Sequence, residues 1–311
     1  MLSFLKKVGN TKITIGIDKE IPVEVEEAQV PSIVRPKNSN EILKDAGFNL
    51  CTSTELKDHV FLGLKADGEK LDRLNFTNSK LKNSQLTKTS LVSCNFTNAD
   101  LTGSNMQQCN LSGAFLDNSN LSHVEMAGAN LENASIIKSE SKSFNASWSN
   151  FYGANMKGMQ VYVGSMLESD LRASYLGSAV MISVNFSKAL MAKIEASNAK
   201  FLGCRFYMAN LDEISFEGSN LSGSDFTRAS LKNANLDGAN LESASFIGAN
   251  LTGATIKGAK FKNTIFDERG LSDLGLDIKT TSGIKMINSS ELVSLYGKDI
   301  NNIDMTALIH A

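Results

Sequence analysis

Proline is nearly absent from this 311-residue sequence: three occur, at positions 22, 31 and 36, and none follows. No run of 18 apolar residues is present, so we expect no transmembrane helix. The first ten residues, MLSFLKKVGN, place their lysines after the apolar residues and lack a signal-peptide core, which argues against Sec-type export. We therefore expect a protein that is cytoplasmic in the producing cell, with a non-Sec route of secretion left open.

Residue types that carry chemistry are also scarce. Four cysteines in so long a chain do not suggest a disulfide scaffold, and the three histidines, His59, His123 and His310, are far apart. No zinc-ligand spacing occurs, and no pair of carboxylates lies in a recognisable pocket context. We therefore predict a protein that is not an enzyme, with no catalytic residue, no metal site and no cofactor.

The net charge is also small, at -2 with histidine neutral. Such a balance provides no bulk attraction for nucleic acid or for an anionic membrane. We expect no direct binding of nucleic acid.

What the sequence does have is a period of five. Residues 229 to 258, cut into fives, read ASLKN ANLDG ANLES ASFIG ANLTG ATIKG. We name the large residue of each five the centre and the residue two places before it the companion. From Leu71 to Phe266 there are 40 centres in one register, and 37 of them are Leu, Phe, Met, Ile or Val. Five is neither the helical period near 3.6 nor the strand period of 2.

A short extended side followed by a turn explains this period. Companion and centre are two residues apart, so they point to the same side of an extended segment. One such segment cannot bury its inward pair alone, and successive segments must therefore wind into a coil and stack on copies of themselves. The sequence predicts an all-β solenoid.

Three centres depart from the pattern. Ala146 has the bulky companion Phe144 and Ala196 has Ile194, so large and small residues exchange places at similar volume. Ser141 has only Ser139 beside it and is the one weak position in the predicted core. Three cysteines, Cys94, Cys109 and Cys204, fall at companion positions, where we expect buried, unreactive thiols.

These units resemble the pentapeptide-repeat family, whose motif is A-(D/N)-L-x-x. Matching triplets begin at Ala99, Ala129, Ala209 and Ala239. The resemblance covers residues 71 to 266 and implies a right-handed quadrilateral β-helix with 20 residues per coil, here about ten coils.

We expect three regions: a small α+β capping region at 1–65, the pentapeptide-repeat β-helix at 66–268 and a short, partly helical non-repeat segment at 269–311. A cap is expected because a solenoid end exposes unpaired strand edges.

Local patterns in the two flanks support this division. Alternating apolar residues at 11–25 predict a β-hairpin, and short helices are expected at 40–46 and near 53–60. A further short helix is expected to start at Asn288 and to end at Gly297.

With four fives per coil, residues 20 apart stack on one face, and the middle coils place large apolar residues outside. Tyr162, Ile182 and Leu202 form one column flanked by Val163 and Val180. Contiguous apolar and aromatic side chains of this kind mark contact surfaces. The predicted protein-contact patch, the mid-rod patch, consists of Trp148, Tyr162, Val163, Leu167, Ile182, Leu202, Tyr207 and Met208. A protein partner, a second copy in a homodimer and a terminal flank folded back are equally good occupants.

Two functions follow. The first is a non-enzymatic protein-interaction scaffold, a rigid rod similar in layout to family members that are bacterial effectors. The second, ranked below it, is a DNA-mimic binder of a type II topoisomerase that protects or inhibits gyrase, an activity known in the family. Residues 71 to 266 carry slightly more Lys and Arg than Asp and Glu. Duplex DNA carries about one negative charge per 1.7 Å, so the charge does not favour mimicry.

Overall fold

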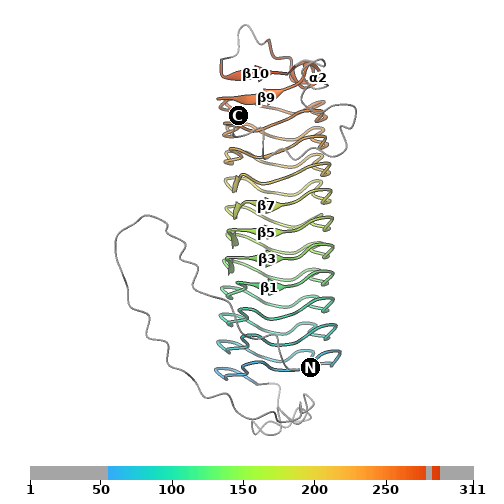
Figure 1. Cartoon of the computed structure of the whole chain (residues 1–311), viewed down its shortest axis with the longest axis vertical. Coiled ribbons are helices and arrows are strands. Elements are labelled where there is room, and N and C mark those ends of the chain that lie inside the picture. Colours follow the sequence, from blue (N-terminus) through green and yellow to red (C-terminus); the bar gives the residue numbers. More distant parts are fainter. Residues whose placement is uncertain (1–54, 278–281, 288–311) are drawn as a thin grey trace, which may run out of the picture. The chain divides into compact units, whose positions relative to one another are not determined.

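The computed structural model describes residues 55–277 and 282–287. Its described part is a parallel β-solenoid. A residue on one side of a coil pairs with the residue 20 positions further along the chain, on the same side of the next coil. This series of bridges begins at Glu55 with Asn75 and continues to Ser245 with Ile265. Residues 55 to 266 make about ten coils at this offset, stacked along one axis in Figure 1. The predicted fold is confirmed.

Regular strands are short and gather in the middle coils. Strands β1, β3, β5 and β7 form one four-stranded parallel sheet, and β2, β4, β6 and β8 form another. Strands β9 and β10 pair at the C-terminal end, with Thr264 opposite Ile284. The elements are β1 Val124–Glu125, β2 Glu140–Ser141, β3 Phe144–Asn145, β4 Gln160–Val161, β5 Gly164–Ser165, β6 Val180–Ile182, β7 Val184–Asn185, β8 Lys200–Leu202, β9 Thr264–Phe266, α2 Glu268–Asp273 and β10 Ile284–Met286.

Each five-residue unit is one side and one corner. The companion, a mid-side residue and the centre form the side, and the next two residues, the first and second turn residues, form the corner. The amide of the next companion donates to the carbonyl of the centre, as in Ser79 to Phe76 at 3.0 Å. The second turn residue, here Asn78 with φ of 60°, has a left-handed backbone. This is the geometry of a type II turn, which favours Gly or Asn at that place.

The Asn or Asp before the centre stabilises the corner. Its side-chain oxygen accepts from the amide of the first turn residue, as in Asn95 to Thr97 at 3.0 Å and Asn240 to Glu242 at 3.1 Å. Short polar side chains of this kind form such local bonds readily. The mid-side position is therefore polar for a local structural reason.

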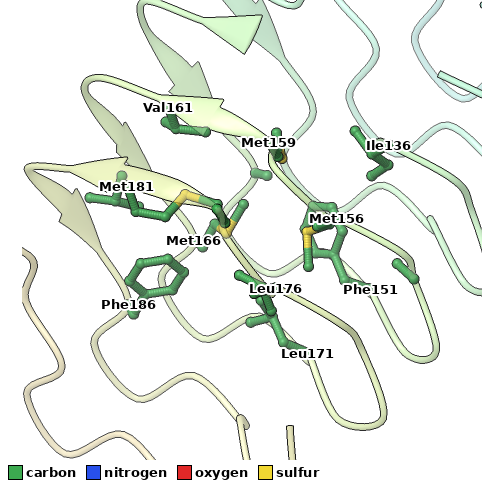
Figure 2. Close-up of a cluster of buried hydrophobic side chains, with 14 of the residues drawn as sticks. Ile136, Phe151, Met156, Met159, Val161, Met166, Leu171, Leu176, Met181 and Phe186 are labelled. Carbon is green, nitrogen blue, oxygen red and sulfur yellow. The ribbon is translucent and has the colours of Figure 1, made fainter. Parts of the chain in front are cut away.

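The core lies inside the coils. Of the 40 centres from Leu71 to Phe266, all are buried except Ile256 and Phe261, which are half-buried near the C-terminal end. Figure 2 shows part of this core in the middle coils, where methionines such as Met156, Met166 and Met181 pack with phenylalanines. Methionine fills irregular space between larger side chains because it is unbranched and flexible.

The predicted exchange of large and small residues is confirmed. Phe144 and Ala146 are both buried, and Gly164 lies above Phe144 in the next coil. A Cβ atom at Gly164 would lie 2.8 Å from the Phe144 carbonyl oxygen, so only glycine fits there. Ser141, the expected weak position, is fully buried, and its Oγ lies 2.9 Å from the carbonyl oxygens of Leu121 and Ser143.

The coils begin earlier than expected. Residues 55–60 form a turn and paired sides of the first coil, not the helix expected near 53–60, so the repeat extends at least ten residues before the predicted boundary at 66. His59 and Glu69 stand at companion positions and hid the pattern. The hairpin at 11–25 and the helix at 40–46, with most of the capping region at 1–65, lie outside the described residues.

The C-terminal end of the repeat carries a short helix, α2. The Asp267 side chain caps it by accepting from the Gly270 amide at 2.8 Å, and Leu271 is buried against the last coil. After α2 the chain returns as β10, which continues the 20-residue offset. A helical C-terminal segment is thus present, although the helix expected from Asn288 lies outside the described residues.

Candidate contact surface

The first group of the mid-rod patch forms one corner column. Tyr162 and Val163 are exposed, at 41% and 55%, whereas Ile182 and Leu202 above them are half-buried. Val180 in β6 is also half-buried. The Tyr162 hydroxyl donates to Gln160 Oε1 at 3.1 Å, which fixes the ring against its own strand. Unlike the second turn residue of most corners, Val163 has no left-handed φ, a conformation that its β-branched side chain disfavours.

The second group lies on the next corner. Trp148 and Met208 are exposed, at 59% and 48%, and share one column with Glu168 and Lys188 between them. Lys188 Nζ pairs with Glu168 Oε1 at 3.0 Å, so this column presents an apolar residue, an ion pair and a second apolar residue.

Leu167 and Tyr207 are first turn residues of the same corner and are half-buried. The Arg205 guanidinium lies over the Tyr207 ring, 5.5 Å from its centroid, and Arg228 donates to the Tyr207 hydroxyl at 3.4 Å. Tyr207 is therefore held in place by contacts from its own chain.

The structure places these two groups on either side of one face. The sheet of β1, β3, β5 and β7 lies between them, and its outward residues are polar: Asn145, Ser165 and Asn185 are half-buried and Glu125 is exposed. The mid-rod patch is thus two apolar corners separated by a narrow polar side rather than one continuous apolar surface.

Three exposed apolar residues in the same coils were missed. Leu190 and Tyr175 occupy mid-side positions, and Tyr152 is the first turn residue of a third corner; their exposures are 40%, 37% and 44%. Leu190 and Tyr175 stand at mid-side positions where Asn or Asp is usual, and that replacement was the signal available in the sequence.

The exposed apolar side chains of the middle coils make up what we call the apolar belt. Elsewhere in the described residues the exposed large apolar side chains are few: Val60 and Leu62 in the first coil, Phe115, and Met286 at the C-terminal end. The belt is therefore confined to about three of the ten coils. Its members are Trp148, Tyr152, Tyr162, Val163, Tyr175, Leu190 and Met208.

A charged pair, Arg172 and Asp170, lies beside Tyr152 at the third corner of the belt. Arg172 lies one coil from Tyr152 in the same column, and it donates to both Asp170 carboxylate oxygens, at 2.9 and 2.7 Å. The bidentate bonds from Arg172 lower the pKa of Asp170, so the carboxylate stays ionised. The belt therefore combines apolar side chains with fixed charges of both signs.

The backbone beneath the belt is unfavourable for two of its residues. Trp148 and Met208 have φ of 59° and 55°, in the left-handed region. Gly or Asn is preferred at these turn positions, and a bulky side chain costs stability there. Folding alone therefore does not explain their selection.

The thiols are buried, as predicted. Cys94, Cys109 and Cys204 each place Sγ within hydrogen-bonding distance of a centre carbonyl 23 residues earlier. Burial raises the pKa of each thiol to about 12.

The described residues also lack two features. No group of three or more His, Cys, Asp or Glu side chains in them could hold a metal ion. No helix among them has the length and apolar character needed to cross a membrane.

The fold and its corners define a four-sided parallel β-solenoid built from five-residue units. Profiles of such repeats match the sequence in two places: one described as a pentapeptide repeat region matches residues 193–269, and one described as eight copies of the pentapeptide repeat matches 70–108 and 99–136. Residues 70–136 and 193–269 are therefore pentapeptide repeats, as the resemblance in the sequence implied.

Comparison with curated proteins found no match. Among solved structures, a trypsin-treated variant of QnrB1, a plasmid-mediated fluoroquinolone resistance protein, is 22% identical over 71% of this chain and 99% of its own, with a TM-score of 0.46. HetL, involved in heterocyst differentiation regulation in the cyanobacterium Nostoc, is 20% identical over 74% and 98%, with a TM-score of 0.31.

Proposed function

We propose that this protein is a non-enzymatic interaction scaffold whose middle coils bind another protein through the apolar belt. The observation that carries the proposal is the confinement of seven exposed large apolar residues to residues 148–208. Single exposed apolar residues are ordinary on protein surfaces, whereas a cluster marks a contact site.

The belt does not stabilise the coils that carry it. The centres of these coils are already buried beneath the surface, and the left-handed backbone at Trp148 and Met208 is a cost. Aromatic residues dominate the energetics of protein interfaces, and the belt has four: Trp148, Tyr152, Tyr162 and Tyr175. Such a distribution favours binding over folding as the reason for these residues.

The size of the belt fits a protein partner. Aromatic side chains bury about 150–250 Å² each, so seven residues that are 37% to 59% exposed present roughly 600–700 Å². Stable interfaces bury about 800 Å² per partner. Because the belt reaches three of the four corners, its partner must clasp the rod or bind with a second molecule on the opposite side.

An effector-type role, in which the rod binds a host protein, extends this proposal by analogy within the family. The DNA-mimic alternative requires a continuous acidic row. In this rod, acidic residues instead pair with basic residues of the neighbouring coil, as Glu168 does with Lys188 and Glu213 with Lys193. We therefore favour the scaffold.

The test is site-specific photocrosslinking in the source cell. A photoreactive phenylalanine analogue replaces Tyr162 in one variant and Thr102, three coils away in the same column, in a matched control. We expect a discrete protein adduct at position 162 that is absent at 102 and is lost when Trp148→Ser and Met208→Ser are added.

The Phe115→Ser variant controls for loss of an exposed apolar residue outside the belt. An adduct of twice the chain mass identifies a second copy as the partner. Equal adducts at positions 162 and 102, or an adduct unaffected by the belt substitutions, would contradict the proposal.

A further inference from the structure

The corner column that carries Trp148 and Met208 has an order of side chains that is complementary to its own reverse. Trp148, Glu168, Lys188 and Met208 are the second turn residues of four consecutive coils, and all four side chains are exposed. Their φ angles lie between 53° and 59°, so the four residues share one backbone geometry. Coils are spaced by about 4.8 Å, so the column is an evenly spaced row of an apolar residue, an anion, a cation and an apolar residue. We call these four residues the central column.

A second copy in the opposite direction matches the central column at every position. A two-fold axis perpendicular to the rod, passing between Glu168 and Lys188, relates one copy of the chain to an antiparallel second copy. Glu168 then faces Lys188 of the second copy, and Lys188 faces Glu168 of the second copy. Trp148 faces Met208 of the second copy, and the symmetry repeats that contact. Because both copies have the same coil spacing, these four contacts form together.

The rest of the column fits the same axis. In Figure 1 the adjoining strands β1, β3, β5 and β7 lie one above another, so the neighbouring column runs along the rod. Further from the axis no two like charges of the column face each other, and its two ends carry opposite charges. The additional facing pairs are Gly128 with Arg228, Gln108 with Gly248, and Lys88 with Glu268, the first residue of α2.

Charge also fixes the register of the two copies. Sliding the second copy by one coil in either direction places the axis on Glu168 or on Lys188. That residue would then face the same residue of the second copy, and two like charges would oppose each other. Like-charge contacts of this kind suppress wrong arrangements. A foreign partner would require none of this self-complementarity, which favours a second copy as the occupant of this corner.

Two leucines extend the contact on either side of the central column. Leu167 precedes Glu168 and is half-buried, whereas Leu190 lies on the other side of the column, in the coil of Lys188, and is exposed. The two-fold axis exchanges the two sides as well as the two ends of the column. It therefore brings Leu167 toward Leu190 of the second copy, which adds apolar contact next to the ion pairs.

We propose that two copies of this chain associate side by side and antiparallel through the central column. The inference rests on the apolar belt being a contact surface and deepens the proposed function: it assigns one corner of the belt to a second copy and leaves Tyr162, at another corner, to a protein that binds the assembled dimer. A single corner presents less than the 800 Å² or so per partner of a stable interface, so association should depend on protein concentration. The facing ion pairs lie at the surface, so association should also weaken in high salt.

Sedimentation of the purified full-length chain over a range of concentrations tests the dimer. Glu168→Lys and Lys188→Glu each place like charges opposite each other at both ion-pair positions, and we expect each to weaken dimerisation at least about tenfold. An equal mixture of the two variants should regain the parent dimer, since one column then carries two lysines and the other carries two glutamates. Neither chain of the mixture regains the ion pair within its own column, so recovery isolates the contact between copies.

Lys193→Glu is the matched control for the charge variants. It removes the equivalent ion pair with Glu213 at another corner of the rod, and it should leave dimerisation unchanged.

Disulfide formation tests the antiparallel orientation. Trp148→Cys is made in a chain that carries a mass tag and Met208→Cys in an untagged chain, both with Cys51→Ser, since the three remaining native thiols are buried. Under mild oxidation the mixture should form the mixed disulfide, and the mixed pair keeps one contact between Trp148 and Met208. Each variant alone should form far less disulfide, because equal positions of the two copies lie three coils apart, roughly 14 Å.

Recovery of the dimer in the charge mixture, together with the mixed disulfide, supports the arrangement. A parent chain that stays monomeric at every concentration would overturn the dimer, and the adduct at position 162 would still test the proposed function separately. A dimer that withstands both single charge variants, a mixture that stays monomeric, or disulfides between equal positions would overturn the central column as its interface.

Discussion

A column of phenylalanines inside the last coils offers a quantitative test of the stacking. Phe186, Phe206, Phe226, Phe246 and Phe266 stack face to face, with centroids 5.2, 4.8, 4.8 and 5.0 Å apart and planes within 7° of parallel. Each ring belongs to a different coil. The column therefore measures how strongly one coil stabilises the next.

The perturbation is Phe226→Leu, which removes the ring and keeps an apolar side chain. Phe226 is fully buried and has two stacked neighbours at 4.8 Å. Aromatic pairs contribute about 0.5–1.5 kcal/mol each beyond area, so two pairs account for roughly 1–3 kcal/mol, with a smaller addition for lost volume. Phe266 has one stacked neighbour, Phe246, so Phe266→Leu should lower the free energy of unfolding by about half as much as Phe226→Leu.

The assay is equilibrium urea unfolding of single and double variants in a double-mutant cycle. Phe226→Leu with Phe246→Leu should show a coupling of about 0.5–1.5 kcal/mol, because the two rings touch. Phe206→Leu with Phe246→Leu, two coils apart, should be additive within about 0.5 kcal/mol. Additive behaviour for the touching pair, or equal coupling for both pairs, would refute nearest-neighbour stacking as the source of stability.

Three further predictions concern register, orientation and pH. Deleting Asn130 should shift every later centre off the inward side and abolish the full solenoid; a circular dichroism melt like that of the parent chain would contradict the register. Leu221→Ala should lower the free energy of unfolding by about 2–5 kcal/mol, whereas Ser222→Ala, on the corner beside it, should cost well under about 1 kcal/mol; equal denaturation midpoints would contradict the inside–outside assignment. The folded thiol pKa of about 12 lies above the unfolded value, so stability is complete below about pH 8.5 and declines as pH rises toward 12. Between pH 8 and 10 we expect a loss of about 1–2 kcal/mol per thiol, compared by urea titration with a triple alanine variant at Cys94, Cys109 and Cys204; identical pH dependence would contradict their burial.

The coil could be derived from sequence because its signal is redundant. Every inward pair repeats the same spacing, so even the exchanged pair Phe144 and Ala146 could be interpreted by volume. The start of the coils at Glu55 could not be derived from the sequence. The polar residues His59 and Glu69 occupy companion positions of the first coil, which are only half-buried and so tolerate them. The six-residue helix α2 has no periodic signal of its own and depends on contact with the last coil.

The candidate surface was only partly predictable. Columns of residues 20 apart follow directly from the period, which identified Tyr162 and Trp148. Exposure does not follow from the column alone, since it depends on neighbouring side chains: Tyr207 is half-buried under Arg205, whereas Leu190 stays open. The burial of Asp225 has no sequence signal, because Asp is the usual residue at a mid-side position.

The most direct test of the contact surface uses the fluorescence of Trp148, the only tryptophan in the chain. At 59% exposure its indole should be quenched readily by acrylamide in the free protein. When the partner captured at position 162 is added, or when the protein self-associates, the emission should shift to the blue and the quenching constant should fall severalfold. Unchanged emission and quenching of Trp148 in a complex of demonstrated stoichiometry would contradict the assignment of the apolar belt as the contact surface.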